Sequence, residues 1–220
     1  MLTLNVQRSR GTALRILCLG AHSDDIEIGC GGLILAALQA RTTVHVTWVV
    51  FSADAVRERE ARRSAKRFLR GARGSTVVVK QFSDGFFFAE GAEIKKEFER
   101  LKRTLSPPDI VFTHYRDDRH QDHRVISDLT WNTFRDHLVL EYETPKYDGD
   151  LGAPNCFMPL DLAVSRKKAA ILRQAFATQQ GKHWFSPETF LGLMRIRGVE
   201  CRAPGGYAEA FYARKLTLAV

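Results

Sequence analysis

The sequence predicts an α/β protein of the Rossmann-like, doubly wound type, with a mostly parallel sheet and helices on both faces. Up to Leu138, short apolar segments alternate with longer amphipathic ones. The apolar segments are rich in β-branched and aromatic residues, as strands are. Pro107-Pro108 closes the third amphipathic segment directly before the fourth apolar one. Strands that alternate with helices are typical of a parallel sheet.

Each predicted element follows from its local pattern. Four apolar runs predict strands over residues 14–19, 43–51, 76–79 and 109–113. The helices expected with them span residues 29–40, 55–69, 93–105 and 125–138. Beyond residue 139 the pattern is less regular, and we expect a strand at 156–158, helices over 166–177 and 187–196, and a closing strand at 210–216. Residues 1–12 are a polar lead-in, and one domain is expected over residues 1–220.

The composition is that of an ordinary globular protein with a basic surface. Of the 220 residues, 45% are hydrophobic and 26% are charged, and the net charge is +8. Much of the positive charge lies in residues 57–73, which favours a solvated basic helix face over a nucleic-acid or membrane partner. No run is long enough to span a membrane, and residues 1–11 lack the apolar core of a signal peptide. We therefore expect a cytoplasmic protein with no nucleic-acid partner.

The cysteines agree with that location. The chain has four of them, Cys18, Cys30, Cys156 and Cys201, and no two form a Cys-x-x-Cys pair. Cys18 falls in a strand that is expected to be buried. Free thiols of this kind are typical of a reducing compartment rather than of a disulfide framework.

Two polar clusters follow predicted strands. Residues 21–32, Ala-His-Ser-Asp-Asp-Ile-Glu-Ile-Gly-Cys-Gly-Gly, come after the first strand, and residues 115–124 come after the fourth. If the sheet has the strand order 3-2-1-4 that is usual for this fold class, the first and fourth strands are neighbours. Ligands in such sheets bind at the carboxyl ends of the strands, where the order reverses. The two clusters are therefore expected to form one site.

The residue types in this site favour metal-dependent hydrolysis. His22, Asp25 and His123 supply two imidazoles and one carboxylate, which suit a zinc ion with an open position for water. Bound zinc can lower the pKa of water to about 7. Asp24 is then the candidate general base. His120, as an imidazolium, is the candidate group that stabilises an oxyanion or protonates a leaving amine.

The two motifs resemble those of the PIG-L (LmbE-like) family of zinc-dependent N-acetylglucosaminyl deacetylases. Residues 21–32 are similar to Ala-His-Pro-Asp-Asp followed by Gly-x-Gly-Gly, and residues 120–123 are similar to His-Pro-Asp-His. Ser23 and Gln121 stand where the family usually has proline. Neither position holds a ligand, so we expect the chemistry to survive both departures.

The resemblance implies hydrolytic N-deacetylation of a small-molecule conjugate of N-acetylglucosamine type, with Zn²⁺ as cofactor or Fe²⁺ in its place. It implies the metal ligands His22, Asp25 and His123 and the general base Asp24, which the residue types also favour, and it implies His120 as the oxyanion-stabilising or acid group. It also implies that Arg57 faces the substrate and that Asp84 binds sugar hydroxyls. Asp122 is expected to orient a histidine or to cap the following helix. The family includes monomers and larger assemblies, so the oligomeric state stays open, with a homo-oligomer among the options.

Alternative functions explain fewer of the residues in the two clusters. The same parts would serve hydrolysis of another small acyl-amide. Two histidines and a carboxylate also bind iron in oxygenases, but those use a His-x-Asp spacing on an all-β fold. A nucleotide-binding loop would need a third glycine where Ile34 stands, and the adjacent Asp24 and Asp25 would repel a pyrophosphate. We expect the glycines at 29–32 to let the loop pack close to the ligands instead.

Specificity is expected to lie outside the two motifs. Residues 142–155 are a candidate lid or recognition loop, and residues 182–185, Lys-His-Trp-Phe, offer a ring on which a sugar could stack.

Overall fold

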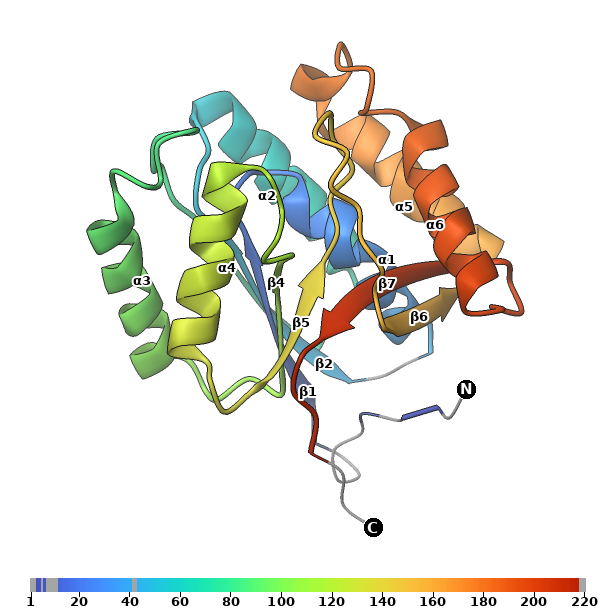
Figure 1. Ribbon diagram of the computed structural model, residues 1–220, viewed down its shortest axis with the longest axis horizontal. Helices are drawn as coiled ribbons and strands as arrows, with labels where there is room; N and C mark the ends of the chain where they lie inside the picture. Colours follow the sequence, from blue (N-terminus) through green and yellow to red (C-terminus); the bar gives the residue numbers. More distant parts are fainter. Residues whose placement is uncertain (1–2, 5, 7–11, 41–42, 218–220) are drawn as a thin grey trace.

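The sheet of this computed structural model has seven strands in the order β3-β2-β1-β4-β5-β7-β6 (Figure 1). The structure describes residues 3–4, 6, 12–40 and 43–217, so most of the lead-in expected at 1–12 lies outside the described residues. The strands are β1 (Leu14–Gly20), β2 (Val44–Val50), β3 (Gly74–Val79), β4 (Ile110–His114), β5 (Leu138–Tyr142), β6 (Cys156–Leu160) and β7 (Tyr207–Ala213). Strands β1 to β5 pair in parallel, whereas β7 is antiparallel to both β5 and β6. The predicted fold class and the assumed order of the first four strands are confirmed.

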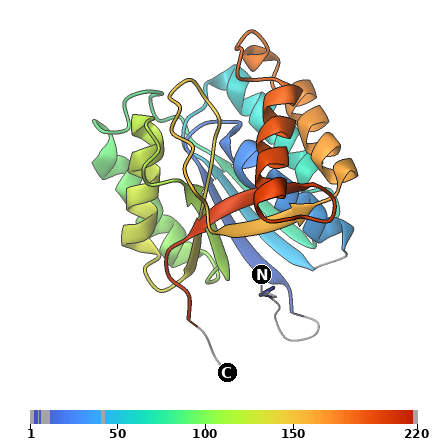
Figure 2. The same ribbon diagram turned by 45° about the vertical axis from the view of Figure 1, so that its right-hand side comes forward.

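Helices cover both faces of the sheet. They are α1 (Asp25–Gln39), α2 (Ala55–Phe68), α3 (Gly91–Thr104), α4 (Gln121–Thr133), α5 (Leu162–Ala175), the 3₁₀ turn η1 (Ala177–Gln179) and α6 (Pro187–Glu200). Helices α3 and α4 lie on one face, and α1, α2, α5 and α6 lie on the other (Figures 1 and 2). In the described ranges, none of these helices combines the length and the apolar character that a bilayer crossing requires.

Each face of the sheet has its own hydrophobic core, because successive side chains of a strand point to opposite faces. In β1, Ile16 and Cys18 pack under α1 and α2, whereas Leu17 and Leu19 pack under α3 and α4. Strand β1 is therefore buried on both sides, and it holds the loop that follows it in a fixed place.

The prediction of a helix over residues 125–138 was wrong at its end. Helix α4 stops at Thr133, and Leu138–Tyr142 form strand β5, which pairs with β4. A short apolar run such as Leu-Val-Leu can continue a helix or begin a strand, and its sequence alone does not distinguish the two. Here the run forms a strand because it pairs with β4 on one side and with β7 on the other.

The last two strands were predicted approximately. The closing strand lies three residues earlier than expected, at Tyr207–Ala213, and it inserts between β5 and β6 (Figure 2). The strand expected at 156–158 continues to Leu160 and includes Pro159. Proline is tolerated there because β6 is an edge strand.

Helix α1 begins four residues earlier than predicted, so the glycines at 29–32 lie in its interior rather than at its start. A Cβ atom on Gly29 would lie 2.2 Å from the ring of Tyr142, and one on Gly31 would lie 2.5 Å from Phe68. The glycines therefore allow α1 to lie directly on β5 and α2. The expectation that they bring a loop close to the ligands was wrong.

A buried ion pair ties the C-terminal part of the fold to the middle of α1. The carboxylate of Glu209 in β7 accepts hydrogen bonds from the backbone N–H groups of Gly32 and Leu33, both at 2.6 Å. The ammonium of Lys168 in α5 donates to Glu209 at 2.6 Å and to the carbonyl oxygen of Ile28 at 2.5 Å. Helices α1 and α5 and strand β7 are thereby joined through charged groups that water does not reach.

The close approach of α1 to β5 predicts a stability effect. Gly29→Ala should lower the free energy of unfolding by about 1–3 kcal/mol, because the added methyl group overlaps the Tyr142 ring. Gly192→Ala in α6 is the matched control, since nothing lies within 4 Å of its Cβ position and alanine favours a helix by about 1 kcal/mol. Urea unfolding measures both. Equal stability of the two variants would contradict the packing described here.

Candidate functional site

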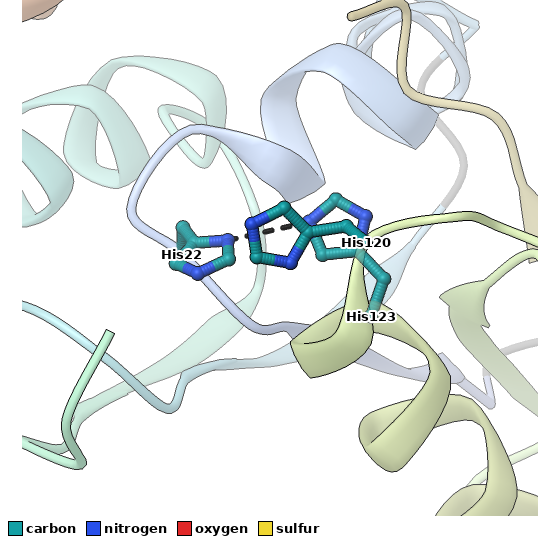
Figure 3. A group of neighbouring side chains, drawn as sticks. All are labelled: His22, His120 and His123. Carbon is teal, nitrogen blue, oxygen red and sulfur yellow. Dashed lines mark hydrogen bonds between the residues drawn. The ribbon is translucent and has the colours of Figure 1, made fainter. Parts of the chain in front are cut away.

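Two segments distant in sequence meet at the carboxyl ends of β1 and β4. His22 lies in the connection from β1 to α1, and His120 and His123 lie at the start of α4. The three imidazole rings converge (Figure 3). His22 Nδ1 is 3.2 Å from His123 Nε2, although the two residues are 101 positions apart in the chain. The structure therefore brings the two predicted clusters together.

The three predicted ligands present donor atoms to one another. His22 Nδ1 lies 3.4 Å from Asp25 Oδ2, and His123 Nε2 lies 3.5 Å from Asp25 Oδ1. Ligand atoms at zinc-ligand distances around a tetrahedral ion are about 3.3–3.6 Å apart. The residues present thus fit a small divalent metal ion with little rearrangement.

Neighbouring residues widen the set of groups within reach of such an ion. Among the described residues, three clusters have ligand atoms within 4.8 Å of one another: His22, His120 and His123; His22, Asp84, His120 and Asp122; and Asp25, His114 and His123. Every one of them includes His22 or His123. Distances alone do not select Asp25 over His120 as the third ligand, and that assignment stays a prediction from the motif.

Each of the two predicted histidine ligands has a buried carboxylate on its other ring nitrogen. His22 Nε2 is 3.2 Å from Asp122 Oδ2, and His123 Nδ1 is 2.9 Å from Asp118 Oδ2. A carboxylate in this position is usual for metal-binding histidines, because it fixes the orientation and tautomer of the ring. Asp122 contacts His22, and its expected role in orienting that ring stays a prediction. The alternative expectation, that Asp122 caps the following helix, was wrong, because the N-cap of α4 is His120. Asp118 was not expected.

The electrostatic environment differs between the two rings. Burial and the nearby His114 lower the pKa of His123 to about 4, so that its ring is neutral at neutral pH. Burial also opposes a charge on His22, but hydrogen bonds to Asp122, Asp25 and Asp84 outweigh it and raise its pKa well above the usual value. Burial opposes ionisation of Asp118 too, yet the hydrogen bond from His123 holds its pKa well below the ordinary range.

Asp122 also anchors the loop that carries Asp84. Its two carboxylate oxygens accept hydrogen bonds from the backbone N–H of Gly85 at 2.6 Å and of Phe87 at 3.2 Å. Asp84 Oδ1 lies 3.0 Å from His22 Nε2, although 75% of the Asp84 side chain is exposed. Asp84 is therefore at the edge of the site, and its predicted contact with sugar hydroxyls stays a prediction.

Asp24 has one occupied and one unoccupied carboxylate oxygen. Its Oδ1 accepts a hydrogen bond from Arg57 Nη2 at 2.7 Å, whereas the buried Oδ2 has no partner among the described residues. Burial raises the pKa of Asp24, the Arg57 guanidinium opposes that rise, and the adjacent Asp25 adds to it. Arg57 also donates to Thr178 Oγ1 at 2.9 Å. The arginine predicted to face substrate thus holds Asp24 in place.

His120 lies beside His22, with 4.8 Å between the ring centroids. Its Nδ1 accepts a hydrogen bond from the backbone N–H of Asp122 at 3.3 Å, which leaves the proton of the neutral ring on Nε2. Burial and the nearby His22 lower the pKa of His120. The ring is therefore a neutral N–H donor, rather than the imidazolium expected from the sequence.

Two residues of the site were missed by the sequence analysis. His114 Nε2 accepts a hydrogen bond from the backbone N–H of Ala21 at 2.9 Å, and its ring stacks on His123 at 3.8 Å. As the last residue of β4, His114 occupies the strand end where such sheets place functional groups, and this position was a usable signal. Asp118 lies within the polar cluster at 115–124, but nothing in the sequence distinguished it from the adjacent Asp117.

These groups lie in a pocket of about 910 Å³, near the upper end of the range for small-molecule sites. His22, Asp24, Asp25, Arg57, Asp84, His120 and His123 all line it. Residues 144–148 and Trp184 add to its walls, so both predicted recognition loops contribute.

Several known proteins are similar to this chain in sequence or in structure. The chain is 30% identical over 142 residues to "Uncharacterized deacetylase YaiS" of Escherichia coli (strain K12), a match that covers 59% of this chain and 74% of that protein. The structure resembles 4-carboxy-2-hydroxymuconate hydratase GalB from Pseudomonas putida KT2440, with a TM-score of 0.72, 18% identity and coverage of 94% and 99% of the two chains. It also resembles N,N'-diacetylchitobiose deacetylase from Pyrococcus horikoshii, with a TM-score of 0.59, 16% identity and coverage of 90% and 83%.

The two solved structures show a shared fold and no more, because both identities are low. The family model is more specific, since it spans both polar clusters. The model of the PIG-L family, described as GlcNAc-PI de-N-acetylase, matches residues 17–134, and the chain therefore belongs to the PIG-L family.

Proposed function

We propose that this protein is a metal-dependent deacetylase that hydrolyses the amide of an N-acetylamino sugar conjugate of N-acetylglucosamine type. The observation that carries the proposal is the unpartnered buried oxygen of Asp24, a residue that lines the same pocket as His22, Asp25 and His123. Membership of the PIG-L family and the sugar deacetylase among the structural neighbours support it.

His22, Asp25 and His123 would hold the metal ion. The preferred ion is Zn²⁺, with Fe²⁺ as the alternative that the same donors accept. The ion would supply Lewis-acid chemistry, because it lowers the pKa of water and polarises a carbonyl group.

Asp24 would accept the proton of the attacking water. Its Oδ2 is free to take a proton, while the bond from Arg57 to Oδ1 fixes the direction in which the carboxylate points. Burial raises the pKa of Asp24, which makes the carboxylate a stronger base. The same oxygen would return the proton to the sugar nitrogen as the amide C–N bond breaks, leaving acetate and a free amine.

His120 would donate a hydrogen bond from Nε2 to the oxygen that becomes negative during attack. A neutral N–H serves as an oxyanion donor without being deprotonated at neutral pH. Its position beside His22 places it in the same pocket as Asp24.

A hydratase has the same fold, so the fold alone does not select the reaction or the substrate. Hydrolysis of another small acyl-amide is the alternative function that the same groups would support. Nucleotide binding has less support, since the glycines at 29–32 are packed inside α1. Iron oxygenase activity has less support, since the fold is α/β rather than all-β.

Acetate release from a panel of N-acetylglucosamine conjugates and simple acyl-amides tests the proposal. The metal-loaded protein should release acetate, and a chelator should abolish the release. Asp24→Asn should keep the bound metal, which mass spectrometry measures. Its activity should fall by about 10²–10⁴-fold, because the proton acceptor is gone. Asp128→Asn, an exposed change on α4, should behave as wild type. Full activity in Asp24→Asn would refute the role of Asp24.

The carboxylate beside His123 predicts an effect on metal affinity. Asp118→Asn should weaken metal binding by about 10–100-fold, because an amide orients the His123 ring less firmly and carries no charge. Competition with a chromophoric chelator measures the affinity, and thermal melting checks that the fold is retained. Asp128→Asn is again the control. Unchanged affinity would show that Asp118 does not support a metal ligand.

The ion pair of Arg57 with Asp24 predicts how the pH dependence of kcat/KM will change when Arg57 is replaced. Its positive charge lowers the pKa of Asp24, so Arg57→Gln should raise that pKa further. Since Asp24 has to be ionised to accept a proton, the acidic limb of the kcat/KM profile should move to higher pH. Arg62→Gln, which removes an exposed arginine bonded to Glu58 on the same helix, should leave the limb in place. A limb that does not move in Arg57→Gln would contradict the assignment.

A further inference from the structure

Arg57 joins Asp24 to a segment that no step of the proposed reaction uses. Its Nη2 donates to Asp24 Oδ1 at 2.7 Å, and its Nη1 donates to Thr178 Oγ1 at 2.9 Å. Thr178 lies in η1, 121 positions after Arg57 in the chain. The guanidinium group is planar, and its donors keep a fixed geometry. The position of Thr178 therefore determines the direction from which Arg57 meets Asp24.

Glu60, which lies one turn after Arg57 on α2, holds Thr178 at two points. Its Oε1 accepts a hydrogen bond from the backbone N–H of Thr178 at 3.0 Å, and its Oε2 accepts one from the hydroxyl at 2.6 Å. Arg57 Nη1 lies 3.4 Å from the same Oε2. Glu60 is only 4% exposed. Its carboxylate is therefore a buried acceptor on which the threonine and the arginine converge.

The direction of these hydrogen bonds follows from the groups involved. A hydroxyl has one proton to donate and two lone pairs that accept, whereas an ionised carboxylate only accepts. The proton of Thr178 therefore goes to Glu60. Its lone pairs are left for Arg57 Nη1 at 2.9 Å and for Gln179 Nε2 at 3.3 Å. Thr178 thus connects Arg57 to Glu60, because it accepts from the first and donates to the second.

Phe176 supports the same guanidinium group from the residue before η1. Its ring is fully buried, and its centroid lies 5.5 Å from Arg57 Cζ, within the range of a cation–π contact. The ring packs edge-on against Phe185, with 6.2 Å between the centroids. Residues 176–178 therefore contact Arg57 through both a ring and a hydroxyl, and Glu60 ties the η1 end of this segment to α2.

We propose that Glu60 is a positioning residue for the deacetylation. By holding Thr178, it fixes the Arg57 guanidinium so that Nη2 meets Asp24 Oδ1 and Oδ2 is left to take the proton of the attacking water. The residues that line the pocket include Asp24 and Arg57 but not Glu60, so Glu60 acts through Arg57 rather than on the substrate. This inference rests on the proposed deacetylase function.

The arrangement requires a carboxylate at position 60. In Glu60→Gln the side chain keeps its size, but one acceptor oxygen is replaced by an NH₂ donor. Whichever way the amide turns, this NH₂ group faces another donor: the backbone N–H of Thr178 in one orientation, or Arg57 Nη1 in the other. Thr178→Val removes the connecting hydroxyl with little change in shape, whereas Thr178→Ser keeps it.

A double-mutant cycle tests the proposal on the metal-loaded protein with the best substrate of the panel. kcat and KM are measured for wild type, Glu60→Gln, Arg57→Gln and the double variant, at a pH above the acidic limb of all four. Glu60→Gln should lower kcat about tenfold, or about 1.4 kcal/mol, with little change in KM. In the Arg57→Gln background it should have no further effect, because the group through which Glu60 acts is gone. An equal loss in both backgrounds, or no loss in the wild-type background, would overturn the proposal.

The hydroxyl variants test the same connection from the other side. Thr178→Val should lower kcat to about the same extent as Glu60→Gln, and Thr178→Ser should keep the wild-type value. Wild-type kcat in Thr178→Val would refute the connection. These variants decide the matter if thermal melting shows that Glu60→Gln does not fold. Glu58→Gln is the matched control, since it removes a carboxylate that pairs with Arg62 on the same helix, and it should leave kcat unchanged.

Nuclear magnetic resonance of the arginine side chains separates this proposal from the proposed function. If the wild-type protein deacetylates no substrate, the proposed function fails, and the Arg57 guanidinium is then observed directly. Because both of its terminal nitrogens are hydrogen-bonded, they should give separate signals, which are assigned by their loss in Arg57→Gln. In Glu60→Gln and Thr178→Val the group should rotate faster, and the two signals should merge. Merged signals in wild type, or separate signals in both variants, would refute the positioning role.

Discussion

The parallel pairing of β1 with β4 is the constraint on which the site depends. Ile16, Leu17 and Cys18 of β1 lie opposite residues 110–112 of β4, with helices packed on both faces of the sheet. Both strands end at the same edge, so the connections that leave them are held a few ångströms apart. His22 and His123 meet for this reason alone, since no segment near either residue in sequence would bring them together. The site is a consequence of strand order rather than of a local motif.

Within the site, carboxylates and imidazoles are packed at a density that is unfavourable unless each group has a partner. Like charges this close, and removed from water, shift pKa values and destabilise the charged forms. The fold distributes the partners among different elements: Arg57 for Asp24, His114 and His123 for Asp25, Lys146 for Asp118, and His22 for Asp122. Each carboxylate is thereby held in one orientation. Of these four carboxylates, only Asp24 has a buried oxygen without a partner among the described residues.

The parts of the structure that the sequence predicted are those set by short-range patterns. Alternation of apolar and amphipathic segments gave the first four strands and their helices, and the usual strand order of the fold class placed His22 opposite His123. Strand β5 was not predicted, because the strand conformation of Leu138–Tyr142 depends on pairing with its neighbours in the sheet. One of those neighbours, β7, lies about 70 residues later in the chain. The close contact of Gly29 with the Tyr142 ring of β5 was likewise not predicted, because no pattern near Gly29 indicates it.

The same distinction applies to the residues of the site. The motif residues were found because their types and spacing are characteristic of metal chemistry. Asp118 and His114 were missed because their importance arises from contacts with His123 that exist only after folding. The tautomer of His120 depends in the same way on the backbone N–H of Asp122, the second residue of α4.

The bond between Glu209 and the backbone of α1 has a consequence for how the protein is made. Gly32 and its hydrogen-bond partner are 177 residues apart. At a synthesis rate of about 5–20 residues per second, roughly 9–35 s pass between the addition of one and of the other. During that interval the helix that begins at Asp25 lacks its buried acidic partner. Lys168, which is added 41 residues before Glu209, lacks the carboxylate that neutralises it for the last part of the interval. The packing of α1 against α5 and β7 therefore stays incomplete until β7 has left the ribosome.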